Sequence, residues 1–318
     1  MTVLLISRSD SAATWAAELR RQAPDMPLKV WPDDIDGLDP ASVTYVIAAK
    51  PPPGEIARYP NVKAVLSLWA GVDHITADPD FPAHLPIARM VESGLTNGMR
   101  EFVMAQALAA HLKLPDYLNQ QRQQLWRPEI RGPHGTEPLV EEVTVGILGL
   151  GVMGEACARA LADFGFPVVG WARSPKDIPG VESLCGDDGL ETLLSRSRIL
   201  VNLLPRTDAT EDILNADLFA KLPEGAYLIN VGRGEHLVEA DLLQALDSGQ
   251  LAGATLDVFR EEPLPGKHPF WTHPAITVTP HIASITRVRT GVGRLRAAIE
   301  SFERGETPEG VVDPKAGY

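Results

Sequence analysis

The chain has 318 residues, which is more than one hydrophobic core usually organises, so two domains are expected. Its 42 acidic residues outnumber the 29 basic ones and give a formal charge of -13, which disfavours a nucleic acid partner. Cys157 and Cys185 are too few for a disulfide framework or a cysteine-ligated metal site, and no apolar run could span a membrane, so we expect a cytoplasmic protein without a metal.

The first hundred residues predict a small α/β lobe. Apolar runs of strand length occur at 2–7, 44–49 and 63–68, and "DSAATWAAELRRQ" has helical spacing after the first of them. The stretch "GMREFVMAQALAAHLKL" (98–114) predicts a long helix with apolar residues on more than one face, which we expect to be buried between lobes or between subunits. The polar segment 119–142 is expected to be an irregular crossing.

From Val143 onward, apolar runs of strand length alternate with helical segments. Six such strands are expected, and this alternation predicts a doubly wound parallel sheet, so the predicted fold class is α/β. A last helix near 287–305 is expected to return to the first lobe, because chain termini commonly lie close together.

A glycine motif of the form G-x-G-x-x-G stands between the first of these strands and a helical run. Gly149 permits a tight turn, Gly151 lets the backbone approach a pyrophosphate, and Gly154 permits close packing of helix on strand. Val152 and Met153, within the motif, are expected to begin a helix whose first N–H groups favour an anion. The motif therefore predicts dinucleotide binding.

An acid that holds the ribose of NAD is expected about 20 residues further on, at the end of the second strand. That strand ends here at Trp171, and Arg173, Ser174 and Lys176 follow it instead of a carboxylate. A guanidinium can bind a 2′-phosphate through two charged hydrogen bonds, and one such bond is worth about tenfold to a hundredfold in affinity. NADP is the predicted cofactor, with NADPH preferred over NADH, unless Arg173 is only a solvated residue at the strand end.

Three charged residues follow successive strands, where open α/β sheets place their ligands. Arg233 follows "YLINVG", Glu262 closes "ATLDVFREE", and His281 follows "ITVTP". Arg233 could bind a carboxylate beside a ketone, His281 could protonate the ketone oxygen, and Glu262 could hold the imidazole in its protonated form. A histidine at a strand end is, taken alone, more often structural. Together the three predict the reduction of a 2-keto acid.

Between residues 146 and 287 the chain resembles the D-2-hydroxyacid dehydrogenase family. The segments that carry the resemblance are "GLGVMG", "NLLPRTDAT", "LINVGRGEHLVEADLLQAL", "LDVFREEPLP" and "VTPHIASIT". "LWRP" (125–128), "FPVVGWARS", "EGAYLIN" and the closing "VVDPKAGY" resemble more narrowly the glyoxylate/hydroxypyruvate reductase A type of that family.

The resemblance implies roles for individual residues. Arg233 would bind the substrate, Glu262 would pair with the histidine, and His281 would be the acid and base. Asp257 would face the carboxamide end of the cofactor. Further cofactor contacts are implied for Leu204, Pro205, Thr207, Val231 and Gly232.

In the first lobe, "WAGVDHI" matches the loop whose backbone N–H groups bind the substrate carboxylate, here those of Ala70 and Gly71. Trp69 would either restrict the pocket to short acids or serve only as a packing residue. Trp126, which would reach the site of a neighbouring subunit, and Arg287 are further pocket candidates.

The family also implies the architecture and the reaction. Two Rossmann-like domains are expected, with an NADP-binding domain (97–287) inserted into a substrate domain (1–96 and 288–318). The predicted protein is a homodimeric oxidoreductase that reduces glyoxylate and hydroxypyruvate with NADPH. The alternatives are a dehydrogenase of a bulkier acid, such as a phenylpyruvate-type or 3-phosphoglycerate-type substrate, and a dinucleotide-sensing protein that resembles a corepressor.

Overall fold

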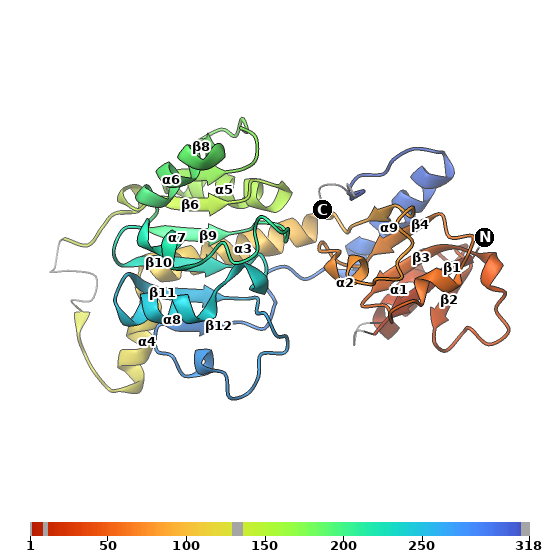
Figure 1. Ribbon diagram of the computed structural model, residues 1–318, viewed down its shortest axis with the longest axis horizontal. Coiled ribbons are helices and arrows are strands. Elements are labelled where there is room, and N and C mark those ends of the chain that lie inside the picture. Colours follow the sequence, from red (N-terminus) through yellow and green to blue (C-terminus); the bar gives the residue numbers. More distant parts are fainter. Residues whose placement is uncertain (1, 9–11, 129–135, 313–318) are drawn as a thin grey trace. The chain divides into compact units, whose positions relative to one another are not determined.

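The protein, described here by a computed structural model at residues 2–8, 12–128 and 136–312, divides into two units (Figure 1). Unit 1 comprises Met1–Leu95 and Ile285–Tyr318, and unit 2 comprises Thr96–Ser284. Unit 2 is therefore an insertion in unit 1. The end of the predicted "VVDPKAGY" motif, from residue 313, lies outside the described residues.

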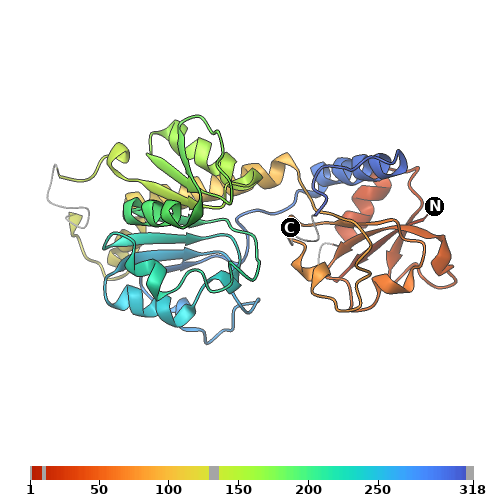
Figure 2. The ribbon, with the colours of Figure 1, turned by 45° about the horizontal axis from the view of Figure 1, so that its top comes forward.

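Unit 1 contains a five-stranded parallel sheet with the strand order β2-β1-β3-β4-β5. Helices α1 and α9 lie together on one face of it (Figure 2). The strands are β1 (Thr2–Ser7), β2 (Leu28–Trp31), β3 (Val43–Ala49), β4 (Ala64–Ser67) and β5 (Ile87–Ala88). The helices are α1 (Ala12–Gln22), α2 (Asp73–Thr76) and α9 (Val288–Glu303), with 3₁₀ turns at Pro40–Ser42 and Ile56–Arg58.

The predicted return of the last helix to the first lobe is confirmed. Tyr45 on β3 donates its hydroxyl hydrogen to Glu303 of α9 at 2.5 Å, and Lys63 forms an ion pair with the same carboxylate at 2.9 Å. The hydrogen bond from Tyr45 lowers the pKa of Glu303. These contacts link two segments of unit 1 that are more than 200 residues apart in the chain.

Unit 2 contains a seven-stranded parallel sheet with the order β12-β11-β10-β9-β6-β7-β8. Apolar residues of α3 and α5 pack on one face, and those of α6, α7 and α8 pack on the other. The strands are β6 (Val145–Leu148), β7 (Val168–Trp171), β8 (Val181–Leu184), β9 (Ile199–Asn202), β10 (Ala226–Asn230), β11 (Leu251–Leu256) and β12 (Ile276–Val278). The helices are α3 (Ser93–His111), α4 (Leu114–Arg122), α5 (Val152–Phe164), α6 (Gly186–Arg196), α7 (Ala216–Ala220) and α8 (Glu239–Asp247), with 3₁₀ turns at Val140–Glu142, Gly234–His236 and Pro269–Trp271.

The doubly wound α/β fold predicted from the sequence is confirmed, but three strands were missed. β2 has one buried residue of four, β8 has none, and β5 is only two residues long. β2, β5 and β8 each lie at an edge of their sheet, so they lack the continuous apolar run by which a central parallel strand is recognised.

The predicted long helix is present, whereas the expectation for the segment after it was partly wrong. α3 covers Ser93–His111 and runs along the sheet of its own unit (Figure 1), against which its buried residues Met99, Val103 and Ala107 pack. The segment expected to be irregular from residue 119 is helical as far as Arg122, because a second helix, α4, starts at Leu114 with Pro115 in its first turn.

Candidate active site

The glycine motif forms a tight turn between β6 and α5. Gly149 has φ +97°, a conformation that side chains disfavour, and a Cβ there would lie 2.8 Å from the carbonyl oxygen of Leu203. A Cβ on Gly154 would lie 1.8 Å from the carbonyl oxygen of Gly149. Both positions therefore require glycine so that α5 can pack closely against the turn.

The start of α5 has the features of a dinucleotide site. Gly151 is the N-cap, and apart from its own chain neighbours no residue has a heavy atom within 4 Å of the place where its Cβ would be. The N–H of Glu155 is bonded to the carbonyl of Gly151 at 2.8 Å, whereas N–H groups earlier in a helix have no acceptor within it. The N–H groups of Val152 and Met153 could therefore hold a phosphate in the open space beside Gly151.

The end of β7 carries the residues proposed to select the cofactor. The indole N–H of Trp171 donates to the carbonyl of Gly186 at 2.9 Å, so the ring is fixed by the protein itself. Arg173, Ser174 and Lys176 follow on an exposed turn. Their side chains are positioned to meet solvent or a ligand.

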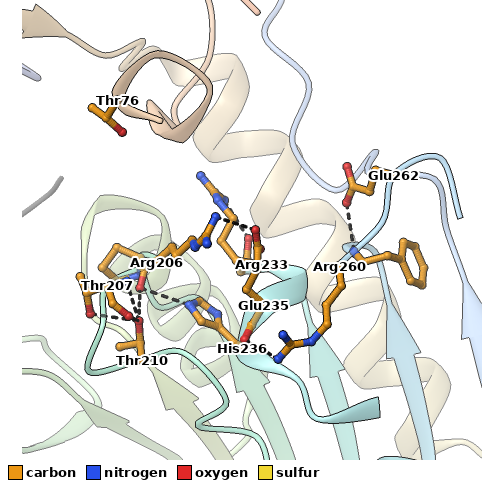
Figure 3. Close-up of polar contacts among 12 residues, drawn as sticks. Thr76, Arg206, Thr207, Thr210, Arg233, Glu235, His236, Arg260 and Glu262 are labelled. Atoms are coloured by element: carbon orange, nitrogen blue, oxygen red, sulfur yellow. Dashed lines mark hydrogen bonds and ion pairs between the residues drawn. The ribbon is translucent and has the colours of Figure 1, made fainter. Parts of the chain in front are cut away.

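The loop after β9 is held by hydrogen bonds around Pro205. Its carbonyl accepts from the hydroxyl of Thr210 at 2.8 Å and lies 3.2 Å from Nε2 of His236 (Figure 3). The N–H of Thr207 donates to the same hydroxyl at 2.8 Å, and Leu204 is buried. A cofactor bound along this edge would meet a rigid loop.

Glu262 and His281 form a close pair. Nδ1 of His281 lies 2.8 Å from Oε2 of Glu262, while Oε1 of Glu262 accepts a hydrogen bond from the N–H of Phe259 at 3.0 Å (Figure 3 shows the second contact). His281 has φ +54°, a strained conformation for a non-glycine residue. About half of its side chain is exposed, so the ring is accessible as well as fixed.

Asp257 fixes the loop that carries His281. The residue is 1% exposed, and its carboxylate accepts three hydrogen bonds: from the hydroxyl of Thr279 at 2.6 Å and from the N–H groups of Ile282 at 2.9 Å and Ala283 at 2.8 Å. These residues lie on both sides of His281. The carboxylate assigned to the cofactor by resemblance therefore has an additional task within the protein.

Arg233 lies just beyond β10, next to the strand that precedes Glu262. Its Nη1 donates to the carbonyl of Gly232 at 2.7 Å. A Cβ on Gly234 would lie 1.9 Å from the carbonyl carbon of Phe259, so the loops after β10 and β11 touch through their backbones. β10, β11 and β12 are neighbours in the sheet, so Arg233, Glu262 and His281 leave three adjacent strands.

In unit 1, the predicted carboxylate loop follows β4. The hydroxyl of Ser67 accepts from the N–H of Trp69 at 3.0 Å and donates to its carbonyl at 2.9 Å, so the loop is tied to the strand. The Trp69 ring packs 4.5 Å from that of His74, and Nζ of Lys50 lies 5.8 Å from its centroid. Trp69 is thus a packed residue that keeps part of its surface exposed.

Two further candidates differ in their surroundings. Arg287 is the N-cap residue of α9, and its N–H donates to the buried carboxylate of Glu92 at 3.4 Å. Trp126 is 94% exposed. In the part of the chain that the structure describes, no group of acidic, histidine or cysteine side chains could hold a metal ion, and none of the helices combines the length and hydropathy that crossing a bilayer requires.

Fold and site together define a nicotinamide-dependent oxidoreductase, with a dinucleotide-type turn and a close histidine–glutamate pair beyond the strand ends of one parallel sheet. Residues 104–283 match the NAD binding domain of the D-isomer specific 2-hydroxyacid dehydrogenases. The chain belongs to the D-isomer specific 2-hydroxyacid dehydrogenase family.

Relatives of the chain are similar over their whole length. Glyoxylate/hydroxypyruvate reductase A of Serratia proteamaculans is 42% identical, and the match covers 100% of both chains. A D-isomer specific 2-hydroxyacid dehydrogenase from Xanthobacter autotrophicus, solved with NADPH and MES, superposes with a TM-score of 0.92 at 38% identity, covering 100% of this chain and 99% of that one. An NADPH-dependent glyoxylate/hydroxypyruvate reductase from Sinorhizobium meliloti, solved with NADP and sulfate, gives 0.91 at 38% identity with the same coverage.

The role of Asp257 in fixing the histidine loop can be tested by Asp257→Asn. The amide cannot accept all three hydrogen bonds, so we expect the free energy of unfolding to fall by about 1.5 to 3 kcal/mol, the value of a hydrogen bond to a charged group. We also expect kcat to fall because His281 is less well fixed. Asp241→Asn is the control. Asp241 lies on α8, and its carboxylate accepts a hydrogen bond of 2.8 Å from the N–H of Ala216 on α7. Equal behaviour of the two variants in chemical unfolding and in turnover would contradict this role.

Proposed function

We propose that this protein is an NADPH-dependent reductase of small 2-keto acids, which converts glyoxylate to glycolate and hydroxypyruvate to D-glycerate in the cytoplasm. The observation that carries the proposal is the 2.8 Å contact between His281 and Glu262, which follow β12 and β11, beside β10, the strand that Arg233 follows. The glycine turn at α5 supplies the place for the cofactor. The names of the relatives, glyoxylate/hydroxypyruvate reductase A, support the choice of substrate.

His281 is the proposed general acid. Because Glu262 is fixed by the N–H of Phe259, it orients the imidazole through Nδ1 and can balance the charge of the protonated ring. Nε2 is then the atom that holds the proton for the ketone oxygen. When bound, the nicotinamide supplies the hydride for the ketone carbon.

Arg233 is the proposed partner of the substrate carboxylate. A guanidinium binds a carboxylate through two parallel hydrogen bonds, and the bond from Nη1 to the carbonyl of Gly232 restrains its orientation. In unit 1, the N–H groups of Ala70 and Gly71 are proposed to bind the same class of anion. Trp69 is proposed to limit the length of the acid, and Arg287 is a further candidate contact.

The proposed cofactor contacts run along the edge of the unit 2 sheet. The N-terminus of α5 would hold the pyrophosphate, and Arg173, Ser174 and Lys176 would hold the 2′-phosphate. Trp171, Leu204, Pro205, Thr207, Val231 and Gly232 would line the cofactor, and Asp257 would lie towards its carboxamide end. The solved relatives with NADPH or NADP support this choice over NAD.

Two other functions remain as outcomes of the assay. A dehydrogenase of a bulkier 2-hydroxy acid would use the same catalytic residues, and a dinucleotide-sensing protein would bind the cofactor without turnover. Activity with phenylpyruvate but not glyoxylate would favour the first, and cofactor binding without any turnover would favour the second.

The reaction is tested by following NADPH absorbance with glyoxylate, hydroxypyruvate, pyruvate and phenylpyruvate. We expect turnover with the first two and a loss of about 10²- to 10⁴-fold in kcat for His281→Ala, the usual worth of a positioned general acid. His84→Ala, which removes an exposed histidine of unit 1, is the control and should behave as wild type. Full activity of His281→Ala would exclude its role as the acid.

Cofactor choice is tested by Arg173→Ala. Because the guanidinium is proposed to bind only the 2′-phosphate, KM for NADPH should rise about tenfold to a hundredfold while KM for NADH stays unchanged. Arg159→Ala is the matched control, since it removes another partly exposed arginine of unit 2, paired with Glu155 on α5. Equal use of NADH and NADPH by the wild type would disprove the role of Arg173.

We propose a homodimer, on the basis of large apolar side chains exposed on and around α4. These are Leu112, Leu114, Leu118, Leu125 and Trp126. Leu118→Glu should convert the dimer to a monomer in light scattering after size exclusion, whereas Phe164→Glu, at the C-terminal end of α5 and outside this set, should not. If Trp126 enters the site of the neighbouring subunit, Trp126→Ala should raise KM for glyoxylate. A wild-type protein that is monomeric at micromolar concentration would refute the proposal.

A further inference from the structure

A buried polar cluster lies at the carboxyl ends of β9 and β10. It consists of Asn202, Asn230 and His236, and each of the three residues is 0% exposed. Polar side chains are costly to bury unless their hydrogen-bonding groups are satisfied. Packing alone does not explain amide and imidazole side chains at these buried positions, so their hydrogen bonds indicate what they do.

The orientation of the Asn202 amide determines which atoms of the cluster donate and which accept. Nδ2 of Asn202 donates to Oδ1 of Asn230 at 2.9 Å and lies 2.8 Å from Nδ1 of His236. Oδ1 of Asn202 accepts from the N–H of Leu204 at 3.3 Å, which fixes the orientation of the amide. Since an amide nitrogen has only hydrogens to offer, Nδ1 of His236 must accept.

This assignment determines the state of His236. With Nδ1 as acceptor, the ring is neutral and carries its proton on Nε2. Nε2 lies 3.2 Å from the carbonyl of Pro205, a group that can only accept, so the donor and the acceptor match (Figure 3). His236 is therefore a bridge that accepts on one side and donates on the other.

The cluster joins the loop that carries Arg233 to the loop that contains Pro205. Nδ2 of Asn230 donates to the carbonyl of Arg233 at 3.1 Å, and Oδ1 accepts from the N–H of Gly232 at 3.2 Å. The fit is tight, because a Cβ on Gly232 would lie 2.8 Å from the Asn202 amide nitrogen and 3.2 Å from Nδ1 of His236. A change in the imidazole would therefore reach both loops.

We propose that His236 is a positioning residue, whose neutral ring fixes Arg233 for the substrate carboxylate and Pro205 for the cofactor through Asn202 and Asn230. The inference rests on the proposed function, because it assigns the substrate to Arg233. His236 itself, being fully buried, is not proposed to touch either ligand. Its effect is on where two backbones lie.

The test compares His236→Leu with His236→Gln. Leucine removes both polar groups, whereas glutamine can accept with its oxygen and donate with its nitrogen as the imidazole does. We expect His236→Leu to raise KM for glyoxylate and the Kd for NADPH, measured by quenching of tryptophan fluorescence, by about tenfold each. His236→Gln should restore both values to within about threefold of wild type.

The matched control is Tyr227→Phe. Tyr227 lies on β10, as Asn230 does, and the substitution removes its buried hydrogen bond of 3.1 Å to Thr255 on β11. It should lower Tm without changing KM or Kd. If His236→Leu behaves like this control, with a lower Tm but unchanged KM and Kd, the role is only structural and the proposal is overturned. The same holds if glutamine fails to restore a folded variant.

Two further measurements keep the test decisive. If His236→Leu does not fold, Asn202→Ala keeps the ring but removes its donor, and should raise KM and Kd by a similar factor; unchanged values would overturn the proposal. If the wild type reduces no keto acid, the proposed function fails and the substrate half of this inference fails with it. The Kd for NADPH still tests the effect on Pro205 separately.

Discussion

The site depends on the parallel arrangement of the seven strands in unit 2, which brings their carboxyl ends to one edge of the sheet. Each strand ends in a loop at this edge, and the backbone N–H and C=O groups beyond the last hydrogen bond between strands need other partners. The protein satisfies many of them with buried polar side chains at or just after the strand ends. Asn202, Asn230 and Asp257 are all 1% exposed or less.

These buried side chains each support a loop that carries a candidate functional group. Asp257 binds the hydroxyl of Thr279 before His281 and the N–H of Ala283 after it, and Asn230 donates to the carbonyl of Arg233. Because buried polar groups bond strongly only when all their partners are present, such networks favour a single loop conformation. Precise loops are what a hydride transfer reaction requires, since small errors in position cost rate.

The sequence predicted the central features of this arrangement because each has a local signal. The glycine spacing, the apolar strands and the charged residues directly after them can be recognised without knowledge of distant contacts, and the family resemblance is confirmed. The edge strands β2 and β8 could not be found in this way, since their alternating or polar pattern is also typical of loops. The helix was predicted to extend to residue 114, but α3 ends at His111, because Lys113 has a left-handed conformation that no sequence motif indicates.

The role of His236 could not be predicted for a different reason. In the sequence it is one of eight histidines, three residues after Arg233 in a motif read for its arginine and glycines. Its partners lie about 30 positions away on another strand and loop, so the bridge exists only after the sheet has formed. Asp257 was noticed only through resemblance, which pointed to the cofactor and not to the loop around His281.

Burial separates the residues that support the site from those proposed to select the cofactor. The supports are buried, so a substitution among them costs folding energy as well as position. Arg173, Ser174 and Lys176 lie on an exposed turn, and their replacement leaves the core intact. Under the proposed function, substitutions on this turn would change cofactor preference without disturbing the contact between His281 and Glu262. The fold is set by the buried sheet, whereas the proposed choice of cofactor rests on a few exposed side chains that the sheet does not constrain.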